Sequence, residues 1–344
     1  MTKAQMLLQA MNDIDDAFLL EAEETLAQQK KPRKIPFKWF VIVLAILGLS
    51  SGAYAAIQWD SVFLAYFKPS VTLIEKLEGN VQNVDAVSDC ETLILKVNQT
   101  IGDESTIYLN LEVSLPDGQT WRDVLPKELT EGEEILSLNP ERYEFYSGEF
   151  QYEDVKEKTE EELTELLKGH AFGPGTGGGK YSDIVLDSSS AQYFLYSSFH
   201  YDILNEKPIT LYIPYFNVAD NENDCVLHGP FVISWFPENR GAQYAFKIDD
   251  ANGTVGEVKI TPFKIYLKLY GFGQTDEYAL ANNCSENILI QYKNGTEKTV
   301  SSLTNDLSGW TGDAYLEYTI RFRTLLDLDT VESIQVGPYI CELE

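Results

Sequence analysis

One uncharged apolar segment constrains this chain more than any other feature. Residues 39–57, WFVIVLAILGLSSGAYAAI, are nineteen residues without a charged side chain. At about 1.5 Å rise per residue, a helix of this length spans roughly 28 Å, close to the thickness of a bilayer core. The segment therefore predicts a transmembrane helix that divides the chain into two parts of different kind.

The residues that flank this segment predict its orientation. The basic ones precede it: Lys30, Lys31, Arg33, Lys34 and Lys38. Because basic flanks stay on the cytoplasmic side, we predict a single-pass protein of the cell membrane with a cytoplasmic N-terminus and extracytoplasmic C-terminal domains. The competing interpretation is a cleaved signal peptide, since Ala53-Tyr54-Ala55 is an A-x-A pattern after an apolar run.

The acidity of the chain lies beyond the predicted span. The 344 residues have a formal net charge of −28, whereas residues 1–38 hold as many basic as acidic residues and the span holds neither. The whole charge therefore belongs to residues 58–344. A part this acidic is repelled by nucleic acid, so we expect no nucleic-acid partner.

The cytoplasmic tail, residues 1–38, contains one candidate partner-binding surface. Leu7, Met11, Ile14 and Phe18 recur at helical spacing and share one face of an amphipathic helix. A short isolated helix cannot bury such a face by itself. This favours docking in the groove of a cytoplasmic partner, and the alternative is a helix that lies loosely near the membrane.

The remainder of the chain has the period of β-strands. Residues 106–115 alternate between apolar and polar side chains without a fault, which predicts a half-buried antiparallel strand. Residues 92–98 repeat the pattern, and Gly102-Asp103-Glu104 between the two predicts a hairpin. Asn294-Gly295 predicts a second hairpin. Many short strands separated by turns are typical of β-sandwiches.

The fold class that we predict is mainly β. After the tail (1–38) and the transmembrane helix (39–57), we expect two Ig-like β-sandwich domains at residues 58–238 and 239–344, with a boundary in PENRG at 237–241. Thr159 and Glu162 fit a capping box and predict one short helix in the first domain. We see no clear internal repeat in the sequence.

The Gly-rich run GPGTGGGK at 173–180 predicts a flexible loop. It does not fit a phosphate-binding loop, because Pro174 stands at the first glycine position and Tyr181 follows the lysine.

No pattern in the sequence specifies a reaction. His170, His200 and His228 are scattered and lack zinc-site spacing. The oxygen-rich stretches at 220–224 and 249–252 lack the EF-hand pattern. We therefore predict a protein that is not an enzyme, with no catalytic residue, no cofactor and no metal.

All four cysteines, Cys90, Cys225, Cys284 and Cys341, lie in the predicted outer part. Four cysteines outside the membrane are compatible with two disulfides, and three pairings are possible. With two domains the simplest pairing is Cys90–Cys225 with Cys284–Cys341, and the alternative is four buried thiols.

Several segments together resemble a known family. They are AMNDIDDAFLLEAEE at 10–24, AAIQWDSVFLAYF at 55–67, ETLILKVNQTIGDESTIYLNLEV at 91–113, GEVKITPFKIYLKL at 256–269 and LDLDTVESIQVG at 326–337. With the basic patch and the single span, the chain resembles anti-sigma-factor-like single-pass membrane proteins of Gram-positive bacteria. The resemblance implies a cytoplasmic tail that holds a sigma factor and outer β-domains that act as sensors.

Two functions follow as hypotheses. The first is a membrane-anchored, anti-sigma-like regulator that couples outer β-domains, with an unknown ligand, to the short tail. The alternative is an anchored extracellular binding module for wall polymer or carbohydrate, without a signalling role. For that module the candidate aromatic platform is Tyr193, Tyr196, Phe199 and Tyr201, although packing within a core also explains these residues.

Overall fold

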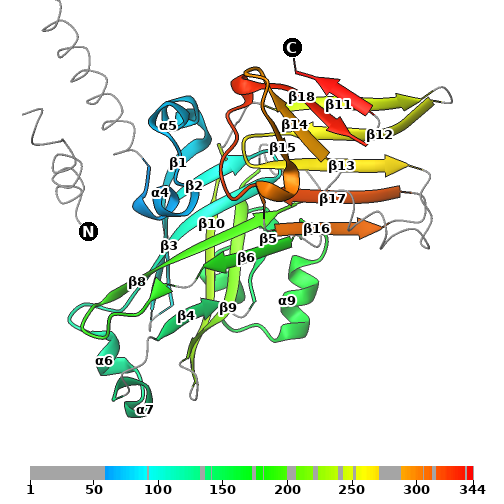
Figure 1. Ribbon diagram of the computed structural model, residues 1–344. Helices are drawn as coiled ribbons and strands as arrows, with labels where there is room; N and C mark the ends of the chain where they lie inside the picture. The colour runs from blue at the N-terminus through cyan, green and yellow to red at the C-terminus, as the bar shows by residue number, and fades with distance from the viewer. Residues whose placement is uncertain are drawn as a thin grey trace, which may run out of the picture. The chain divides into compact units, whose positions relative to one another are not determined.

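The computed structural model describes residues 59–344 apart from gaps at 91–92, 132–135, 141, 173–175, 181, 200–206, 220–223, 239–242, 251–252, 271–287, 305, 312–314, 338 and 344. The predicted tail helix and the predicted span, residues 1–57, lie outside the described residues. Among the described residues, no helix is long and apolar enough to cross a membrane. The described chain is mainly β, with four antiparallel sheets and few, short helices (Figure 1).

The chain forms two compact units. The first unit ends at Leu64 and resumes over Pro69–Glu78, and the second combines Ala65–Lys68 with Gly79–Glu344. The described elements at the start of the chain are α4 (Ser61–Phe67), α5 (Val71–Lys76) and the 3-10 turn η1 (Glu78–Asn80). Ser70 begins α5, because its hydroxyl accepts a hydrogen bond from the backbone N–H of Leu73 at 3.3 Å.

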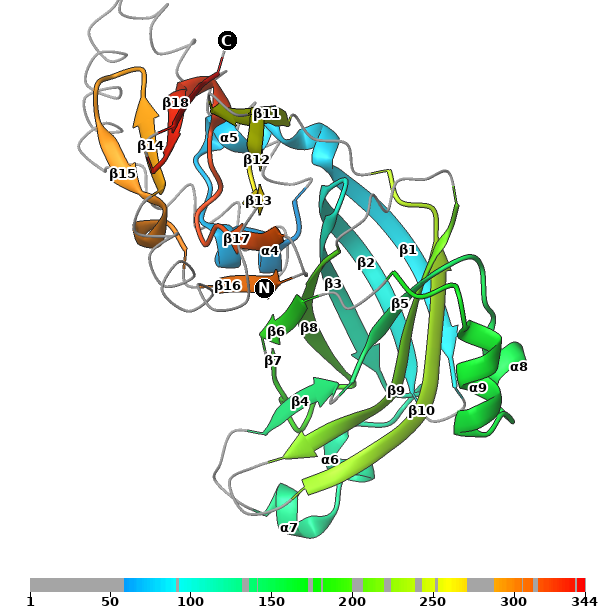
Figure 2. The ribbon, with the colours of Figure 1, turned by 90° about the vertical axis from the view of Figure 1, so that its right-hand side faces the viewer.

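The first β region, residues 81–235, contains two sheets. In spatial order the first sheet is β1 (Val81–Asp89), β2 (Ile94–Asp103), β3 (Thr106–Ser114), β8 (Ser190–Ser198) and β6 (Thr176–Lys180). The second is β10 (Asp224–Trp235), β9 (Ile209–Ala219), β4 (Ser137–Pro140) and β7 (Ser182–Asp183), with β5 (Glu144–Ser147) also paired to β9. Apolar side chains of both sheets, such as Leu109 of β3 and Leu211 of β9, form one core. Figure 2 shows β9 and β10 facing β1–β3.

Strand β3 confirms one part of its prediction and corrects another. It pairs with β2 through the predicted hairpin, and Ile107, Leu109, Leu111 and Val113 are fully buried. The opposite face, expected to be exposed, is buried as well at Tyr108 (1% exposed). The aromatic rings of Phe67, Phe194 and Phe263 cover it. These rings belong to distant parts of the chain, so the local alternation of the strand does not predict them.

The short helices also differ from the prediction of one helix. The first β region contains α6 (Trp121–Val124), α7 (Lys127–Thr130), α8 (Tyr152–Val155) and the predicted α9 (Glu160–Leu167). The first three are single turns, which are too short for a helical period to show in the sequence.

The Gly-rich run is not wholly a loop. Residues 176–180 form the edge strand β6, which pairs with β8 from Thr176–Ser198 to Lys180–Phe194. The prediction of a flexible loop was therefore wrong for these five residues. An edge strand requires only backbone donors and acceptors along one side, and glycine supplies both.

The second β region, residues 244–342, has two sheets of its own. The first is β11 (Tyr244–Asp250), β12 (Gly253–Ile260), β13 (Lys264–Tyr270), β17 (Tyr315–Arg321) and β16 (Asp306–Thr311). The second is β15 (Glu297–Thr299), β14 (Ile288–Tyr292), β18 (Val331–Val336) and β19 (Tyr339–Glu342), with 3-10 turns η2 (Val300–Ser302) and η3 (Leu328–Thr330). The predicted hairpin at Asn294-Gly295 is confirmed, since β14 pairs with β15 and Gly295 has a φ of +80°. The two sheets enclose a separate apolar core.

The two β regions share one strand order. In each region, the first sheet begins with three consecutive strands. A later strand pairs with the third of them, and an edge strand pairs with that later strand, which gives the orders β1-β2-β3-β8-β6 and β11-β12-β13-β17-β16. In each second sheet, a final hairpin adds to an earlier strand: β10-β9-β4 and β19-β18-β14. The strand order thus repeats although the sequence has no clear repeat, because a topology depends on the burial pattern and not on residue identity. The predicted boundary at residue 238 falls between the two regions and stays a prediction.

Candidate functional site

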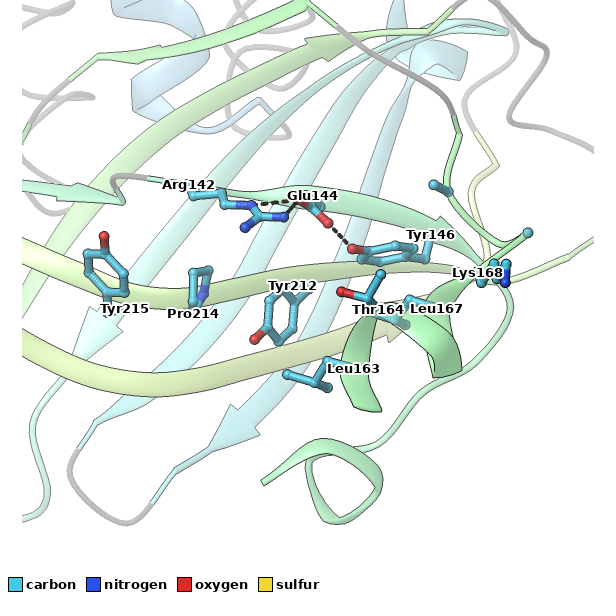
Figure 3. Close-up of a pocket in the computed structure, with 12 residues that line it drawn as sticks. Arg142, Glu144, Tyr146, Leu163, Thr164, Leu167, Lys168, Tyr212, Pro214 and Tyr215 are labelled. Carbon is cyan, nitrogen blue, oxygen red and sulfur yellow. Dashed lines mark hydrogen bonds and ion pairs between the residues drawn. The ribbon is translucent and has the colours of Figure 1, made fainter. Parts of the chain in front are cut away.

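A cavity of about 590 Å³ lies in the first β region between α9 and the strands β5 and β9 (Figure 3). This volume falls within the range of small-molecule sites. The residues that line it are Arg142, Glu144, Tyr146, Leu163, Thr164, Leu167, Lys168, Gly169, Ala171, Tyr212, Pro214 and Tyr215. Three tyrosines and one Arg–Glu pair therefore share a single concave surface.

The strands provide one wall of this cavity. Glu144 and Tyr146 are two residues apart on β5, so strand alternation places them on one face, and Arg142, just before the strand, lines the same cavity. Glu144 is the register partner of Tyr212 on β9, and Pro214 follows two residues later on the same strand. The inward residues of β9, Leu211 and Ile213, are buried in the core. The cavity wall is thus the outer face of a sheet whose inner face is packed.

Glu144 joins the polar groups of this wall into one row. Arg142 Nε donates a hydrogen bond to Glu144 Oε1 at 2.6 Å, and the Tyr146 hydroxyl donates to the other carboxylate oxygen. Both oxygens of Glu144 are therefore engaged. A carboxylate held in this way orients its neighbours and is poorly placed to take a proton from a substrate.

Helix α9 provides the opposite wall. A reciprocal capping box begins it: Thr159 N–H donates to Glu162 Oε2 at 2.9 Å, and the Thr159 hydroxyl accepts from Glu162 N–H at 3.3 Å. Gly169, with φ of +81°, follows its last turn. Leu167 is buried and Leu163 is half-buried. Figure 3 shows Leu163, Thr164 and Leu167 of the helix beside Tyr146 and Tyr212.

Two charged or polar groups stand at the end of α9. Lys168 lies 3.2 Å from Glu165, and both side chains are more than two-thirds exposed, so this pair contributes little to stability. His170 follows, with its Nδ1 at 2.8 Å from the carbonyl oxygen of Ser147 and its ring edge-on to Phe150. His170 is thus tied to the backbone beside the cavity.

Metal chemistry finds no support among the described residues. Within them, no group of three or more His, Cys, Asp or Glu side chains is arranged to hold a metal ion. His200 and most of the stretch at 220–224 lie outside the described residues, and Asp224 begins β10.

The sequence-predicted aromatic platform does not form one surface. Tyr193 and Phe199 are buried in the core of the first β region, whereas the Tyr196 ring packs against Tyr108 on the other face of the sheet. Strand alternation separates them, and Tyr201 lies outside the described residues. The four tail residues Leu7, Met11, Ile14 and Phe18 also lie outside the described residues, so their partner-binding role stays a prediction.

The predicted disulfide pairing stays a prediction. Cys225 and Cys341 carry thiols, and Cys284 lies outside the described residues.

The residues that line the cavity were missed at the level of sequence. Two stretches of the sequence contain them: ERYEFY at 141–146, in which every residue is charged or aromatic, and LYIPYF at 211–216, in which three residues are aromatic. Neither stretch shows which face points outward, nor that α9 packs over both. Only the pairing of β5 with β9 brings them together.

Comparisons with known proteins add little to this picture. No protein-family model matches the chain, and no curated protein matches it. Among solved structures, the chain is similar to one described as the conserved domain protein from Bacillus anthracis, with 8% identity and a TM-score of 0.40 over 74% of this chain and 75% of that one. A similarity of this size carries no argument about fold or function, so function is argued from the cavity.

Proposed function

We propose that the chain is a membrane-anchored, extracytoplasmic binding protein whose first β region holds a short saccharide, such as a segment of wall polymer, in the α9 cavity. The observation that carries this proposal is the cavity of about 590 Å³ in which Tyr146, Tyr212 and Tyr215 surround an Arg142–Glu144 pair.

The composition of the cavity supports a saccharide. A sugar ring has faces of C–H groups and a rim of hydroxyls, so it requires apolar flat surfaces beside fixed polar groups. Tyrosine supplies a large apolar ring with a polar tip. The Arg142–Glu144 row supplies donors and acceptors that are already held in place, which reduces the ordering that binding requires.

Binding is favoured over hydrolysis. Cleavage of a glycosidic bond requires a carboxylic acid and a second carboxylate on either side of the bond. The residues that line the cavity include one carboxylate, Glu144, and its two oxygens are occupied by Arg142 and Tyr146. The proposal is therefore a binding module and not an enzyme.

The setting of this module is also part of the proposal. The two β regions form Ig-like sandwich domains outside the cell, and residues 39–57 anchor them in the membrane. The basic residues before residue 39 support this orientation.

The test is binding of named sugars to the full chain in detergent. Isothermal titration with chitotetraose and with maltotetraose, together with co-sedimentation on purified peptidoglycan, covers an amino sugar, a glucan and the intact wall. We expect one of these probes to bind the chain, and Tyr212→Ala to weaken that binding at least tenfold. Tyr339→Ala is the matched control, a half-buried tyrosine in the second β region. If no probe binds, or if Tyr212→Ala binds as well as the control, the proposal fails.

The regulator hypothesis concerns residues 1–38 and stays a prediction. It expects the tail to co-purify with a sigma factor, and Met11→Asp with Phe18→Asp to abolish capture. Equal capture by the double variant would exclude this helix face as the contact.

A further inference from the structure

Two equivalent turns of the β regions contact each other. They are the turn between β2 and β3 and the turn between β12 and β13. We name their contact the turn junction and define it as Asp103, Ser105 and Thr106 with Thr261, Phe263 and Lys264. By strand order and register, Asp103 pairs across its turn with Thr106, and Thr261 occupies the same place relative to Lys264.

The junction joins equivalent positions to each other. The Thr261 hydroxyl donates to Asp103 Oδ2 at 2.7 Å, and Lys264 Nζ donates to Thr106 Oγ1 at 2.6 Å. Each of these contacts connects one position of the first turn with its counterpart in the second.

The junction contains a buried ion pair. Lys264 Nζ lies 3.3 Å from Asp103 Oδ1, and the two side chains are 5% and 4% exposed. The ammonium also donates to Ser105 Oγ at 2.5 Å, so its three donors have three acceptors. Burial lowers the pKa of Lys264, and the charge of Asp103 opposes this effect. Removing either partner would leave the other charge buried without its counter-charge, so the ion pair favours the joined arrangement of the two turns.

A third chain segment packs against the same junction. The Phe67 ring, 1% exposed, lies edge-on to Tyr108 with centroids 4.9 Å apart, and 6.2 Å from the ring of Phe263. Tyr108 in turn lies 5.8 Å from Phe263. Beside Phe67, Tyr66 stacks on Phe194 of β8 at 4.3 Å. Residues 65–68 therefore contact both β regions at the point where the regions contact each other.

We propose that the turn junction is a coupling device, in which the position of Ala65–Lys68 depends on the contact between the two β regions. The Phe67 ring packs against Tyr108 of the first region and Phe263 of the second, so any change in the contact between the turns alters the packing of this ring. Residues 65–68 follow the predicted span at 39–57 closely in sequence. A rearrangement between the outer regions is thereby transmitted toward the membrane. This inference goes beyond the proposed saccharide binding and does not depend on it.

Hydrogen–deuterium exchange with mass spectrometry on the full chain tests the coupling. Lys264→Met breaks the ion pair without touching Phe67. We expect exchange to become at least threefold faster in the turn at 102–106 and also at 65–68. The matched control is Lys268→Met on the same strand, whose partner is Glu317 at 2.8 Å outside the junction. The control should leave exchange at 65–68 unchanged.

The reverse variant examines the coupling from the other end. Phe67→Leu should accelerate exchange at both turns, because it removes the aromatic ring that packs against Tyr108 and Phe263. If circular dichroism shows that Lys264→Met does not fold, Thr261→Val takes its place with the same expectation, since it removes the hydroxyl that donates to Asp103 and accepts from the backbone N–H groups of Phe263 and Lys264. Faster exchange at the turns with unchanged exchange at 65–68 overturns the proposal, and so does unchanged exchange at both places.

Discussion

The first and second β regions have the same strand order, but their connections differ. Between β5 and β6 the first region inserts α8 and α9, whereas the second region joins β15 to β16 through the short turn η2. The cavity lies under α9, so it depends on the insertion and not on the repeated sheets. The two regions therefore share a framework of sheets, whereas the candidate site is added by the connection between β5 and β6 of the first region.

Equivalent positions of the framework also differ in what covers them. Residues 107–109 and 265–267 both read Ile-Tyr-Leu at the same place in β3 and β13. Tyr108 is buried under Phe67 and Phe263, and its hydroxyl has no hydrogen-bond partner among the described residues. Tyr266 is half-buried, and its hydroxyl donates to Glu317 at 2.8 Å. The same residue thus has a packing role in one region and a polar role in the other.

The largest expected effect concerns the ion pair that joins the two regions. Lys264→Met alone should lower the free energy of unfolding by about 3–5 kcal/mol, because it leaves the Asp103 carboxylate buried without its cation. Asp103→Leu with Lys264→Met should recover most of this loss, since neither charge of the pair is left buried without its partner. Urea unfolding followed by circular dichroism measures both variants. A single variant as stable as the wild type would show that the ion pair does not stabilise the contact between the turns.

The next effect tests whether the two cores are equally well packed. Leu109→Ala and Leu267→Ala remove equivalent, fully buried side chains, and each should lower the free energy of unfolding by about 2–5 kcal/mol. Val87→Ala, at a position 56% exposed, is the control and should change it little. If Leu267→Ala behaved like the control, the second region would be a loosely packed appendage rather than a second framework.

A smaller effect should be confined to the insertion. Thr159→Ala removes the capping box of α9 and should destabilise that helix by about 1 kcal/mol. Because α9 is one wall of the cavity, saccharide binding should weaken by up to about fivefold. Titration calorimetry measures it, with Thr299→Ala before η2 as the control, since the side chain of Thr299 makes no cap hydrogen bond. Equal binding by Thr159→Ala would exclude α9 from the site.

A further comparison concerns the equivalent tyrosines Tyr108 and Tyr266 and depends on pH. Burial raises the pKa of Tyr108 well above its ordinary value, and burial with the Glu317 hydrogen bond raises that of Tyr266. An unfolded phenol ionises near pH 10 while these stay neutral, so their contribution to stability is present below pH 10 and is lost as the pH rises further. Tyr108→Phe and Tyr266→Phe should each lose less stability than the wild type between pH 9 and pH 11.

At pH 7 the two tyrosine variants should differ in stability. Tyr266→Phe loses a hydrogen bond to a charged group and should be less stable by about 1–2 kcal/mol. Tyr108→Phe removes a buried hydroxyl without a partner among the described residues and should be neutral or stabilising. Thermal unfolding at pH 7, pH 9 and pH 11 measures the stability differences between the variants and the wild type. Equal losses at pH 7 would contradict the distinction between a packing and a polar role.

Much of the fold could be predicted because its signals are local. The structure confirms the strand predicted from the alternation at 106–115, the hairpin predicted from Asn294-Gly295, and the helix start predicted from Thr159 and Glu162. The cavity could not be predicted in this way. Its tyrosines lie on β5 and β9, and strand alternation alone does not say which face of a strand a helix will cover.

The sequence by itself determined the mainly β class, the positions of several strands and turns, and the concentration of negative charge after residue 57. These properties follow from neighbouring residues, whose period and turn preferences act over a few positions. Only the tertiary structure decided that the two regions repeat one strand order, that Tyr108 is buried, and that Asp103 meets Lys264. Each of these features depends on contacts between residues that are distant in the chain. Packing and desolvation select which residues meet, and the local sequence pattern does not predict them.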